Sequence, residues 1–317
     1  MQNTQNMPFF SVVIPVYNKA KYLESTLNSV LSQTLDDYEI ILIDDGSVDD
    51  PNQIIRLFTT SKINYYYQEN AGVSAARNAG IDKSIGKYIA FLDADDFWYP
   101  NHLQELKTLI LDFPDCGMYC NRYKIKTSAR HFQEISFRGI NATFRGIVGN
   151  YFYSNIPFRI PTASSVALSK NILTDLEGFD IAKSSGEDVE LWTKVGLKFP
   201  VAISNKTTVI YNFETPSSLS KQVIHPNQIM DFTQFEAIEK NNLFLKEFLD
   251  LHRFFYAIQF KAWGNENEAE LIFRKINPKN IRLINHVLFK LPGFILRFLY
   301  KIKRQMKKIG IEFSTYN

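Results

Sequence analysis

The chain has 317 residues, of which 45% are hydrophobic and 22% charged, a composition that excludes intrinsic disorder and allows one large α/β domain with an appendage, or two domains. The formal net charge is +3, and because the excess lies near the C-terminus, we expect no nucleic-acid-binding surface across the main domain. The N-terminus has no secretory-type stretch and no apolar run approaches the ~20 residues that span a bilayer, so we expect a cytoplasmic protein with Cys116 and Cys120 as free, buried thiols.

Apolar runs and helical patterns alternate through the first 112 residues. Strands are predicted over 10–16, 39–43, 63–67 and 88–92, and helices over 23–31, 54–58, 73–84 and 103–111. This alternation predicts an α/β fold with a mostly parallel, Rossmann-like sheet flanked by helices. In such sheets ligands bind beyond the carboxyl ends of the strands. Polar clusters at 17–18, 44–45 and 93–96 follow three of these strands, so we expect one crevice to collect them.

The middle of the chain is less regular. A strand over 117–126 is predicted in a segment, 117–165, that we otherwise expect to form loops with short strands. A strand over 165–168, a helix over 186–196 and a strand pair over 201–211 follow, and the pattern is helical from Pro226 onward. We therefore expect a domain over 1–225, with halves 9–112 and 113–225, and a helical region over 226–317.

The strand predicted over 88–92 runs directly into three carboxylates, Asp93, Asp95 and Asp96. Because side chains alternate along an extended segment, Asp93 and Asp95 lie on the same side and could both face one ion. Carboxylates at the end of a buried strand repel one another, and a hard divalent cation such as Mn²⁺ or Mg²⁺ would compensate them. A polar turn is the alternative, since such triplets occur in many turns.

Two further acidic clusters each allow two interpretations. In Asp44-Asp45-Gly46-Ser47 a carboxylate could accept the imide N–H of a pyrimidine base, or the residues could simply end a strand and cap a helix. Arg77 could place a cation near the base or phosphates, or be a solvated helix charge. Glu187-Asp188 could supply a general base on a rigid helix, or only acids that suit the helix dipole.

Two common phosphate-binding signatures are absent. No G-x-G-x-x-G follows the first predicted strand, which argues against a dinucleotide site. The segment from Gly80 to Gly86-Lys87 has five intervening residues instead of four, and Tyr88 stands where a P-loop has Ser or Thr.

Six motifs occur in order along the chain: Pro15-Val16-Tyr17-Asn18, Asp44-Asp45-Gly46-Ser47, Asn70-Ala71-Gly72 through Arg77-Asn78-Ala79-Gly80, Asp93-Ala94-Asp95-Asp96, Gly178-Phe179-Asp180 and Glu187-Asp188. Together they resemble the family 2 glycosyltransferases with the GT-A fold, over residues 9–220. The resemblance implies a nucleotide-sugar donor, most often a UDP-sugar, and transfer with inversion at the anomeric carbon.

The resemblance also implies roles for individual residues. The nucleotide would be bordered by Pro15, Tyr17, Asp44, Asp45 and Arg77. Asp95 would be the main protein ligand of Mn²⁺ or Mg²⁺, and Asp93 would approach the ribose or the metal. Asp188 would be the catalytic base, with Glu187 and Trp192 on the acceptor side.

The chain departs from the family pattern after this base. Members often carry a basic or His-containing stretch before a Ser-Leu-Ser, whereas Asn212 and Glu214 stand here before Ser218-Leu219-Ser220. Lys221 or His225 could substitute, so the third metal ligand and the diphosphate clamp stay unassigned.

The C-terminal tail is basic and amphipathic. Residues 290–310 contain seven Lys or Arg and no Asp or Glu, interleaved with apolar side chains. Such a helix could lie on an anionic membrane as a peripheral contact, or pack on the catalytic domain with a solvated basic face.

We therefore expect a metal-dependent inverting glycosyltransferase of cell-surface polysaccharide or glycolipid biosynthesis, acting on a glycan or lipid-linked acceptor at the cytoplasmic face of a membrane. The alternatives are a nucleotidyltransferase and a non-catalytic scaffold that binds sugars or nucleotides.

Overall fold

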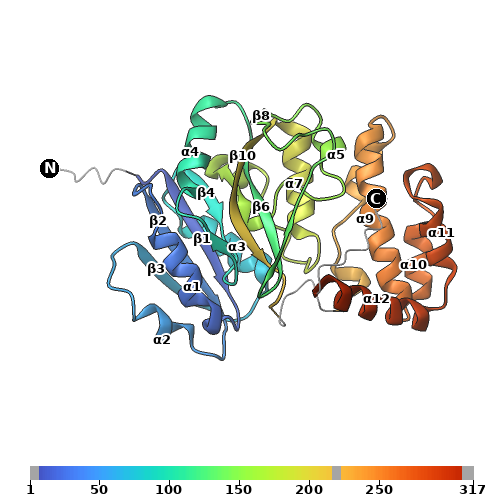
Figure 1. Ribbon diagram of the computed structural model, residues 1–317, viewed down its shortest axis with the longest axis horizontal. Coiled ribbons are helices and arrows are strands. Elements are labelled where there is room, and N and C mark those ends of the chain that lie inside the picture. Colours follow the sequence, from blue (N-terminus) through green and yellow to red (C-terminus); the bar gives the residue numbers. More distant parts are fainter. Residues whose placement is uncertain (1–6, 216–222, 309–317) are drawn as a thin grey trace.

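The computed structural model describes residues 7–215 and 223–308. Within these residues ten strands form one mixed sheet in the order β3-β2-β1-β4-β9-β6-β10-β5, with β7 paired to β6 and β8 to β10 (Figure 1). The strands are β1 Phe10–Val16, β2 Tyr38–Asp45, β3 Ile63–Gln68, β4 Tyr88–Phe91, β5 Phe97–Trp98, β6 Met118–Ser128, β7 His131–Glu134, β8 Gly146–Ile147, β9 Val166–Ser169 and β10 Val201–Asn212.

Helices connect and cover these strands. The α-helices are α1 Ala20–Leu31, α2 Pro51–Ile55, α3 Val73–Lys83, α4 His102–Asp112, α5 Tyr151–Ser154, α6 Lys170–Asp175, α7 Glu187–Lys198, α8 Glu236–Glu239, α9 Leu243–Ala262, α10 Glu266–Phe273, α11 Leu283–Lys290 and α12 Gly293–Lys308. Short 3-10 helices lie at Ala163–Ser165, Pro226–Gln228, Thr233–Phe235 and Pro278–Asn280.

The first half of the sheet is parallel, as the sequence predicts. β1 pairs in parallel with both β2 and β4, and β2 with β3. β9 is antiparallel to both β4 and β6, and it joins this half to a second one in which β10 runs parallel to β6. The predicted α/β class with flanking helices is thus confirmed, and the antiparallel pairs are concentrated beyond β4.

The central strands are apolar on both faces because helices cover both. Val12 and Val13 are adjacent on β1 and point to opposite faces, yet both are fully buried. Strands of this kind form continuous hydrophobic runs rather than alternating ones. The same burial encloses Cys116 and Cys120, which are free thiols as expected.

Two segments differ from the prediction. The segment 201–211, predicted as a strand pair, forms the single strand β10, whose register against β6 shifts between Ile203 and Val209. A bulge of this kind absorbs a break in the alternating pattern without ending the strand. The segment 117–165 is more regular than expected, because it contains the long strand β6 as well as β7, β8 and α5.

The helical C-terminal region packs against the sheet domain. α9 contacts α5 and α10, and α12 contacts both α9 and β6. In Figure 1 α9 to α12 stand together on one side of the sheet. Among the described residues, none of the helices is both long and apolar enough to cross a membrane.

Gly80 fixes how closely α3 approaches β1. It lies inside α3, where glycine is an unfavourable helix residue, and a Cβ added there would overlap the Val13 side chain on β1. The glycine of the motif Arg77-Asn78-Ala79-Gly80 therefore allows close helix–sheet packing, and α3 carries Arg77 at the height of the sheet's carboxyl edge.

We predict that Gly80→Ala lowers the free energy of unfolding by about 1–3 kcal/mol, because overpacking against Val13 outweighs the gain in helix propensity. Urea denaturation would measure it. Gly149→Ala is the matched control, since nothing lies within 4 Å of the place that its Cβ would occupy, and its stability should be unchanged or slightly higher. Equal stability of Gly80→Ala and the native chain would contradict the packing argument.

Candidate active site

One cavity of about 940 Å³ opens at the carboxyl edge of the parallel strands. Most residues that the sequence assigns to a site line it, and they come from the ends of β1, β2 and β4 and from the starts of α3 and α7. They are Pro15, Tyr17, Asp45, Arg77, Asp93, Asp95, Glu187 and Asp188. The carboxyl-edge rule for parallel sheets explains why segments so distant in sequence meet here.

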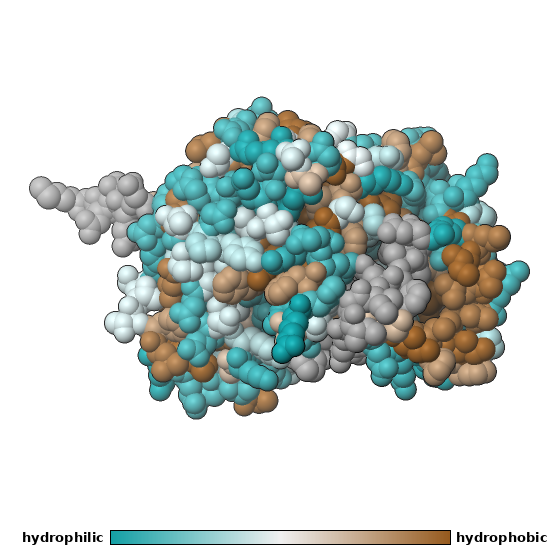
Figure 2. Space-filling view, in the orientation of Figure 1, coloured by the Kyte–Doolittle hydropathy of each residue, from teal (hydrophilic) through white to brown (hydrophobic). Residues whose placement is uncertain are grey.

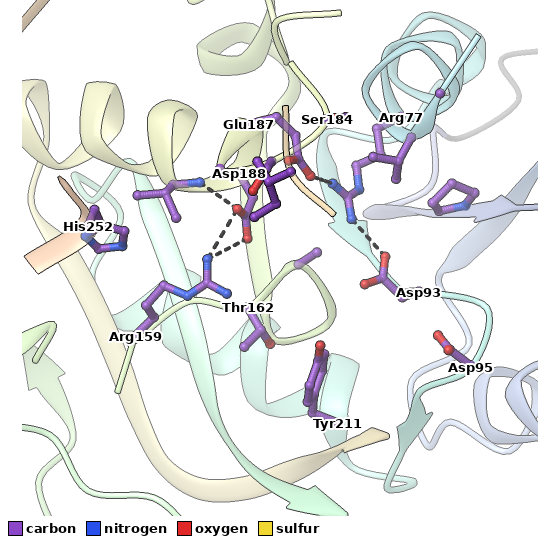
Figure 3. Close-up of a pocket in the computed structure, with 18 of the residues that line it drawn as sticks. Arg77, Asp93, Asp95, Arg159, Thr162, Ser184, Glu187, Asp188, Tyr211 and His252 are labelled. Carbon is purple, nitrogen blue, oxygen red and sulfur yellow. Dashed lines mark hydrogen bonds and ion pairs between the residues drawn. The ribbon is translucent and has the colours of Figure 1, made fainter. Parts of the chain in front are cut away.

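Arg77 lies between two carboxylates of this cavity (Figure 3). Its Nη2 donates to Asp93 Oδ1 at 2.9 Å and its Nη1 to Glu187 Oε1 at 3.0 Å. The side chain is only 5% exposed, so Arg77 is no solvated helix charge. Burial alone would lower the pKa of Arg77, but Asp93 and Glu187 outweigh it and raise the pKa above the ordinary value. Arg77 therefore stays charged and positions both acids.

Asp188 is held by a second arginine. Arg159 Nη1 lies 3.0 Å from Asp188 Oδ2, and the Val189 N–H donates to Asp188 Oδ1 at 2.8 Å. Burial alone would raise the pKa of Asp188, but Arg159 and then Arg77 lower it below the ordinary value. Asp188 is thus ionised at neutral pH and can accept a proton.

Glu187, the neighbour of Asp188, behaves in the opposite way. Burial and then the charge of Asp188 raise the pKa of Glu187 above its ordinary value, against the influence of Arg77. The pair therefore separates into one acid that ionises readily and one that ionises less readily. This arrangement is consistent with a single general base at this place rather than two equivalent ones.

Asp95 faces the cavity beside a lysine. Lys19 Nζ lies 2.8 Å from Asp95 Oδ2, and the two side chains are 13% and 14% exposed. Within the described ranges, no three His, Cys, Asp or Glu side chains are grouped to hold a metal ion by themselves. Mg²⁺ commonly uses one or two carboxylates together with substrate phosphates and water. Asp93 and Asp95 fit that partial set of ligands, and a diphosphate would have to complete it.

Asp44 and Asp45 have different places, although they are adjacent. Asp45 lines the cavity, and its carboxylate accepts hydrogen bonds from the Ala71 and Gly72 N–H groups, which fixes the loop before α3. Asp44 is buried away from the cavity and accepts from Ser47 N–H and Tyr65 O–H. The expectation that Asp44 borders the nucleotide directly is therefore not met, because its carboxylate closes the turn after β2.

Asp96 anchors the acidic segment instead of facing the cavity. Its buried carboxylate accepts from Ser164 O–H and from Asn212 N–H at 2.8 Å. Burial, and then Asp95 and Asp93, raise the pKa of Asp96 well above the ordinary value. Asn212, where the chain departs from the family pattern, donates its backbone N–H to this carboxylate. The bond ties the end of β10 to the turn that carries Asp93 and Asp95.

Trp192, expected on the acceptor side, lies in the core. It is 1% exposed, is absent from the cavity lining, and its ring packs against Phe91 and Phe179 at centroid distances of 6.2 and 5.7 Å. Trp192 follows Asp188 by four residues, so it lies one helical turn further along α7, on the side that packs against the sheet. An apolar position in an amphipathic helix is the physical reason for this placement.

Of the two cations expected after Asp188, Lys221 and His225, the described residues contain His225, which does not line the cavity. Glu214 forms an ion pair with Lys126 at 3.2 Å, and His225 is exposed. Lys221 and Ser218-Leu219-Ser220 lie outside the described residues. Sequence reasoning missed Arg159, which stands in an irregular segment between Pro157 and Pro161 with no periodic signal.

Sequence reasoning also missed the wall that α9 contributes. Phe248, Leu251, His252 and Phe255 line the cavity from this helix, and Lys303 of α12 lines it as well. Burial lowers the pKa of His252 to about 4, so this imidazole is neutral at pH 7. α9 and α12 thus contribute part of the cavity wall.

Gly186 explains how α9 comes so close to Asp188. This glycine precedes α7 with a left-handed φ of 78°, and a Cβ there would overlap the Tyr256 hydroxyl group of α9. A side chain at this position would be strained by its backbone conformation and would displace the Tyr256 hydroxyl group.

A family model described as Glycosyl transferase family 2 matches residues 11–171, about half of the chain. An uncharacterised glycosyltransferase of Rickettsia bellii is 33% identical over 187 residues, 58% of this chain and 26% of that protein. Glycosyltransferase GlyA of Streptococcus pneumoniae is 38% identical over 124 residues, 38% of this chain and 18% of that protein. The matches therefore span less than a third of the first curated relatives' length.

Solved structures show a similar fold. The crystal structure of S. aureus TarS 1–349 in complex with UDP-GlcNAc has a TM-score of 0.59 and 19% identity, with 95% of this chain and 79% of that chain covered. The crystal structure of S. aureus TarS has a TM-score of 0.61 and covers 93% of this chain and 54% of that chain. At this identity the likeness establishes the fold alone, which is the GT-A type that the motifs imply.

We predict that Arg159→Gln raises the pKa of Asp188 and destabilises the protein by about 1–2 kcal/mol at pH 7, less than for a fully buried pair because Arg159 is 39% exposed. A carboxylate with a lowered folded-state pKa stabilises the fold above its unfolded pKa, and that stability is lost as pH falls through the folded pKa. The difference in free energy of unfolding between variant and native protein should therefore narrow as the pH falls below the raised pKa of Asp188 in the variant.

Urea titrations between pH 4 and pH 8 would measure this difference. Arg145→Gln is the control, because Arg145 pairs with the half-exposed Asp112 at the surface and should cost at most about 1 kcal/mol. A stability difference that stays constant over the whole pH range would contradict the proposed ion pair.

Proposed function

The chain belongs to glycosyl transferase family 2, and from this premise we propose that it transfers a sugar from a nucleotide-diphosphate sugar to an acceptor hydroxyl with inversion at the anomeric carbon. The observation that carries the proposal is that one cavity brings Asp93 and Asp95, after β4, together with Asp188, at the start of α7. A similar fold has been solved in complex with UDP-GlcNAc, which supports a UDP-sugar as donor.

The reaction we propose is a single displacement. Asp188 accepts the proton of the acceptor hydroxyl, the freed oxygen pair forms the new bond to C1, and the bond from C1 to the diphosphate oxygen breaks on the opposite face. Arg159 keeps Asp188 ionised and oriented before the step. Arg77 keeps Glu187 and Asp93 on their two sides of the cavity, so donor and acceptor would meet in a fixed geometry.

A divalent cation fits the donor side of this site. Lys19, Arg77 and Arg159 each already pair with a carboxylate of the cavity. A diphosphate would bring further negative charge next to Asp93 and Asp95, and a divalent cation bound there would compensate it. When bound there, Mn²⁺ or Mg²⁺ would stabilise the charge that develops on the departing diphosphate.

The acceptor that we propose is a glycan or a lipid-linked sugar in the synthesis of cell-surface polysaccharide or glycolipid. Residues 290–310 would then serve as a peripheral membrane contact at the cytoplasmic face. Family membership and the absence of a Gly-rich phosphate loop argue against a nucleotidyltransferase. A scaffold without activity would bind the donor but would not turn it over, which separates the two experimentally.

We predict that Asp188→Asn lowers turnover by about 10²–10⁴-fold and leaves donor binding nearly unchanged, because the variant keeps the shape but not the proton acceptor. UDP-sugar hydrolysis with Mn²⁺ would report turnover, and calorimetry with UDP would report binding. Asp175→Asn, an exposed carboxylate outside the cavity, should behave like the native protein. Near-native turnover of Asp188→Asn would refute its role, and no hydrolysis by the native protein under any donor would favour the scaffold.

We predict opposite effects at the two partners of the Lys19–Asp95 pair. Asp95→Ala should abolish Mn²⁺-dependent UDP binding, because it removes the main protein ligand. Lys19→Met should bind Mn²⁺ roughly fivefold more tightly without nucleotide, because it removes a cation that competes for Asp95. Calorimetry with Mn²⁺ alone and with UDP would measure both.

Lys21→Met is the control for Lys19, since Lys21 lies two residues further along and is exposed outside the cavity. Unchanged Mn²⁺-dependent UDP affinity in Asp95→Ala would count against the metal site.

A further inference from the structure

Large apolar side chains are exposed on α11 and α12. Leu283 and Val287 on α11 are 81% and 51% exposed, and Phe294 and Phe298 on α12 are 64% and 62% exposed. Figure 2 shows hydrophobic surface gathered at the right-hand side of the molecule, where α10 to α12 lie in Figure 1. A cluster on two consecutive helices indicates an interaction site, unlike single exposed residues. We define the α11–α12 face by Leu283, Ile284, Val287, Phe294, Phe298 and Ile302.

The inward side of α12 is already occupied by protein. Leu296 is buried, and the Tyr300 hydroxyl group accepts a hydrogen bond from Gln259 Nε2 of α9 at 2.6 Å. Phe294, Phe298 and Ile302 follow one another at spacings of four, so they form one stripe on another side of the helix. α12 is therefore docked by one side and presents an apolar stripe by another.

Positive charge borders this stripe. Arg297 and Lys301 are exposed on the flank of α12 that lies between the apolar stripe and the docked side. Lys290 is exposed at the end of α11. In the sequence, residues 271–311 contain eleven Lys or Arg and no Asp or Glu. A second copy of the chain would bring the same positive charge to this face, so self-association through it is disfavoured. An anionic surface is complementary to it.

We infer that the α11–α12 face docks on an anionic lipid bilayer, with α12 lying in the interfacial plane. An apolar stripe beside a basic one is the pattern that places a helix in the headgroup region. Each basic residue near such a surface adds to binding, and the contribution weakens with salt. Leu283, Ile284 and Val287 of α11 add exposed apolar side chains directly before α12 in the chain.

The docked helix also reaches the active-site cavity. Lys303 follows Ile302 directly on α12 and lines the cavity, together with Phe248 and Phe255 of α9. At 1.5 Å per helical residue, Phe298 and Lys303 are about 7–8 Å apart along the axis. α12 would therefore lie between the bilayer, on its apolar stripe, and the cavity, which Lys303 lines from the docked side. Resting on the proposed function, this placement assigns the acceptor to the lipid-linked class, since the helix that would lie on the bilayer also lines the cavity that holds Asp188.

Vesicle flotation of the full chain tests the docking surface. We expect the protein to float with vesicles of phosphatidylcholine containing phosphatidylglycerol at low salt, and to remain behind with phosphatidylcholine alone. Arg297→Glu/Lys301→Glu should reduce the partition coefficient roughly 30-fold or more. Phe294→Ser/Phe298→Ser should reduce it at least about tenfold.

Matched controls lie elsewhere on the surface. Arg130→Glu/Lys206→Glu makes the same charge change at exposed positions of the sheet domain, and Leu57→Ser/Leu111→Ser removes two exposed apolar side chains there. Both should float like the native chain. Equal flotation of all variants, or no flotation of the native chain, would overturn the proposal. Self-association that is lost in Phe294→Ser/Phe298→Ser, without vesicle binding, would also overturn it and assign the face to a second copy.

Depth-dependent quenching tests the placement of the cavity. A fluorophore on Ile302→Cys should be quenched by brominated lipid, and one on Ile85→Cys, an exposed position before β4 at the opposite, amino edge of the sheet, should not. Quenching at neither position would overturn the orientation. These readouts need no nucleotide, so they can fail while Mn²⁺-dependent UDP binding persists. Conversely, if the native chain does not bind UDP in the presence of Mn²⁺, the proposed function is refuted and the lipid contact is unaffected.

Discussion

The buried guanidinium group of Arg77 holds the two sides of the cavity together. It is bonded to Asp93, which follows β4, and to Glu187, which begins α7. Removing one partner of a buried pair costs about 3–5 kcal/mol, since the other charge is left without compensation. The end of β4 and the start of α7 therefore cannot move independently. The acid that follows a strand is positioned relative to the acid that begins a helix 94 positions later in the chain.

The same balance of charge separates the roles of the acids around Arg77. Glu187 shares Arg77 with Asp93, whereas Asp188 has Arg159 as a partner of its own. Two adjacent carboxylates in one cavity repel each other, and the extra cation decides which of them stays ionised. The pKa of Asp188 is accordingly lowered while that of Glu187 is raised. Assigning the base to Asp188 thus depends on a residue, Arg159, outside every motif that indicated the site.

Local pattern and topology together predicted the parallel half of the fold and most of its site. The strands β1, β2 and β4 are buried apolar runs, and the rule that their carboxyl ends share an edge was enough to bring Asp45, Asp93 and Asp95 together. Arg159 was not predictable in this way, since its segment has no periodic signal. The helical pattern of α9 was visible in the sequence, but its place in the cavity wall depends on long-range packing, which no local pattern encodes. Trp192 was misplaced because it lies one helical turn further along α7 than Asp188, where the helix packs against Phe91 and Phe179 instead of lining the cavity.

The C-terminal helices complete this argument, because they are bound to the catalytic machinery by packing that sequence periodicity does not reveal. Gly186, directly before Glu187 and Asp188, leaves just enough room for Tyr256 of α9, and the Ser185 and Tyr256 hydroxyl groups lie 3.3 Å apart. α12 packs on α9 in turn. A surface that orients α12 therefore also orients α9, and through α9 the helix α7 that carries the proposed base. A membrane contact at α12 would in this way orient the cavity.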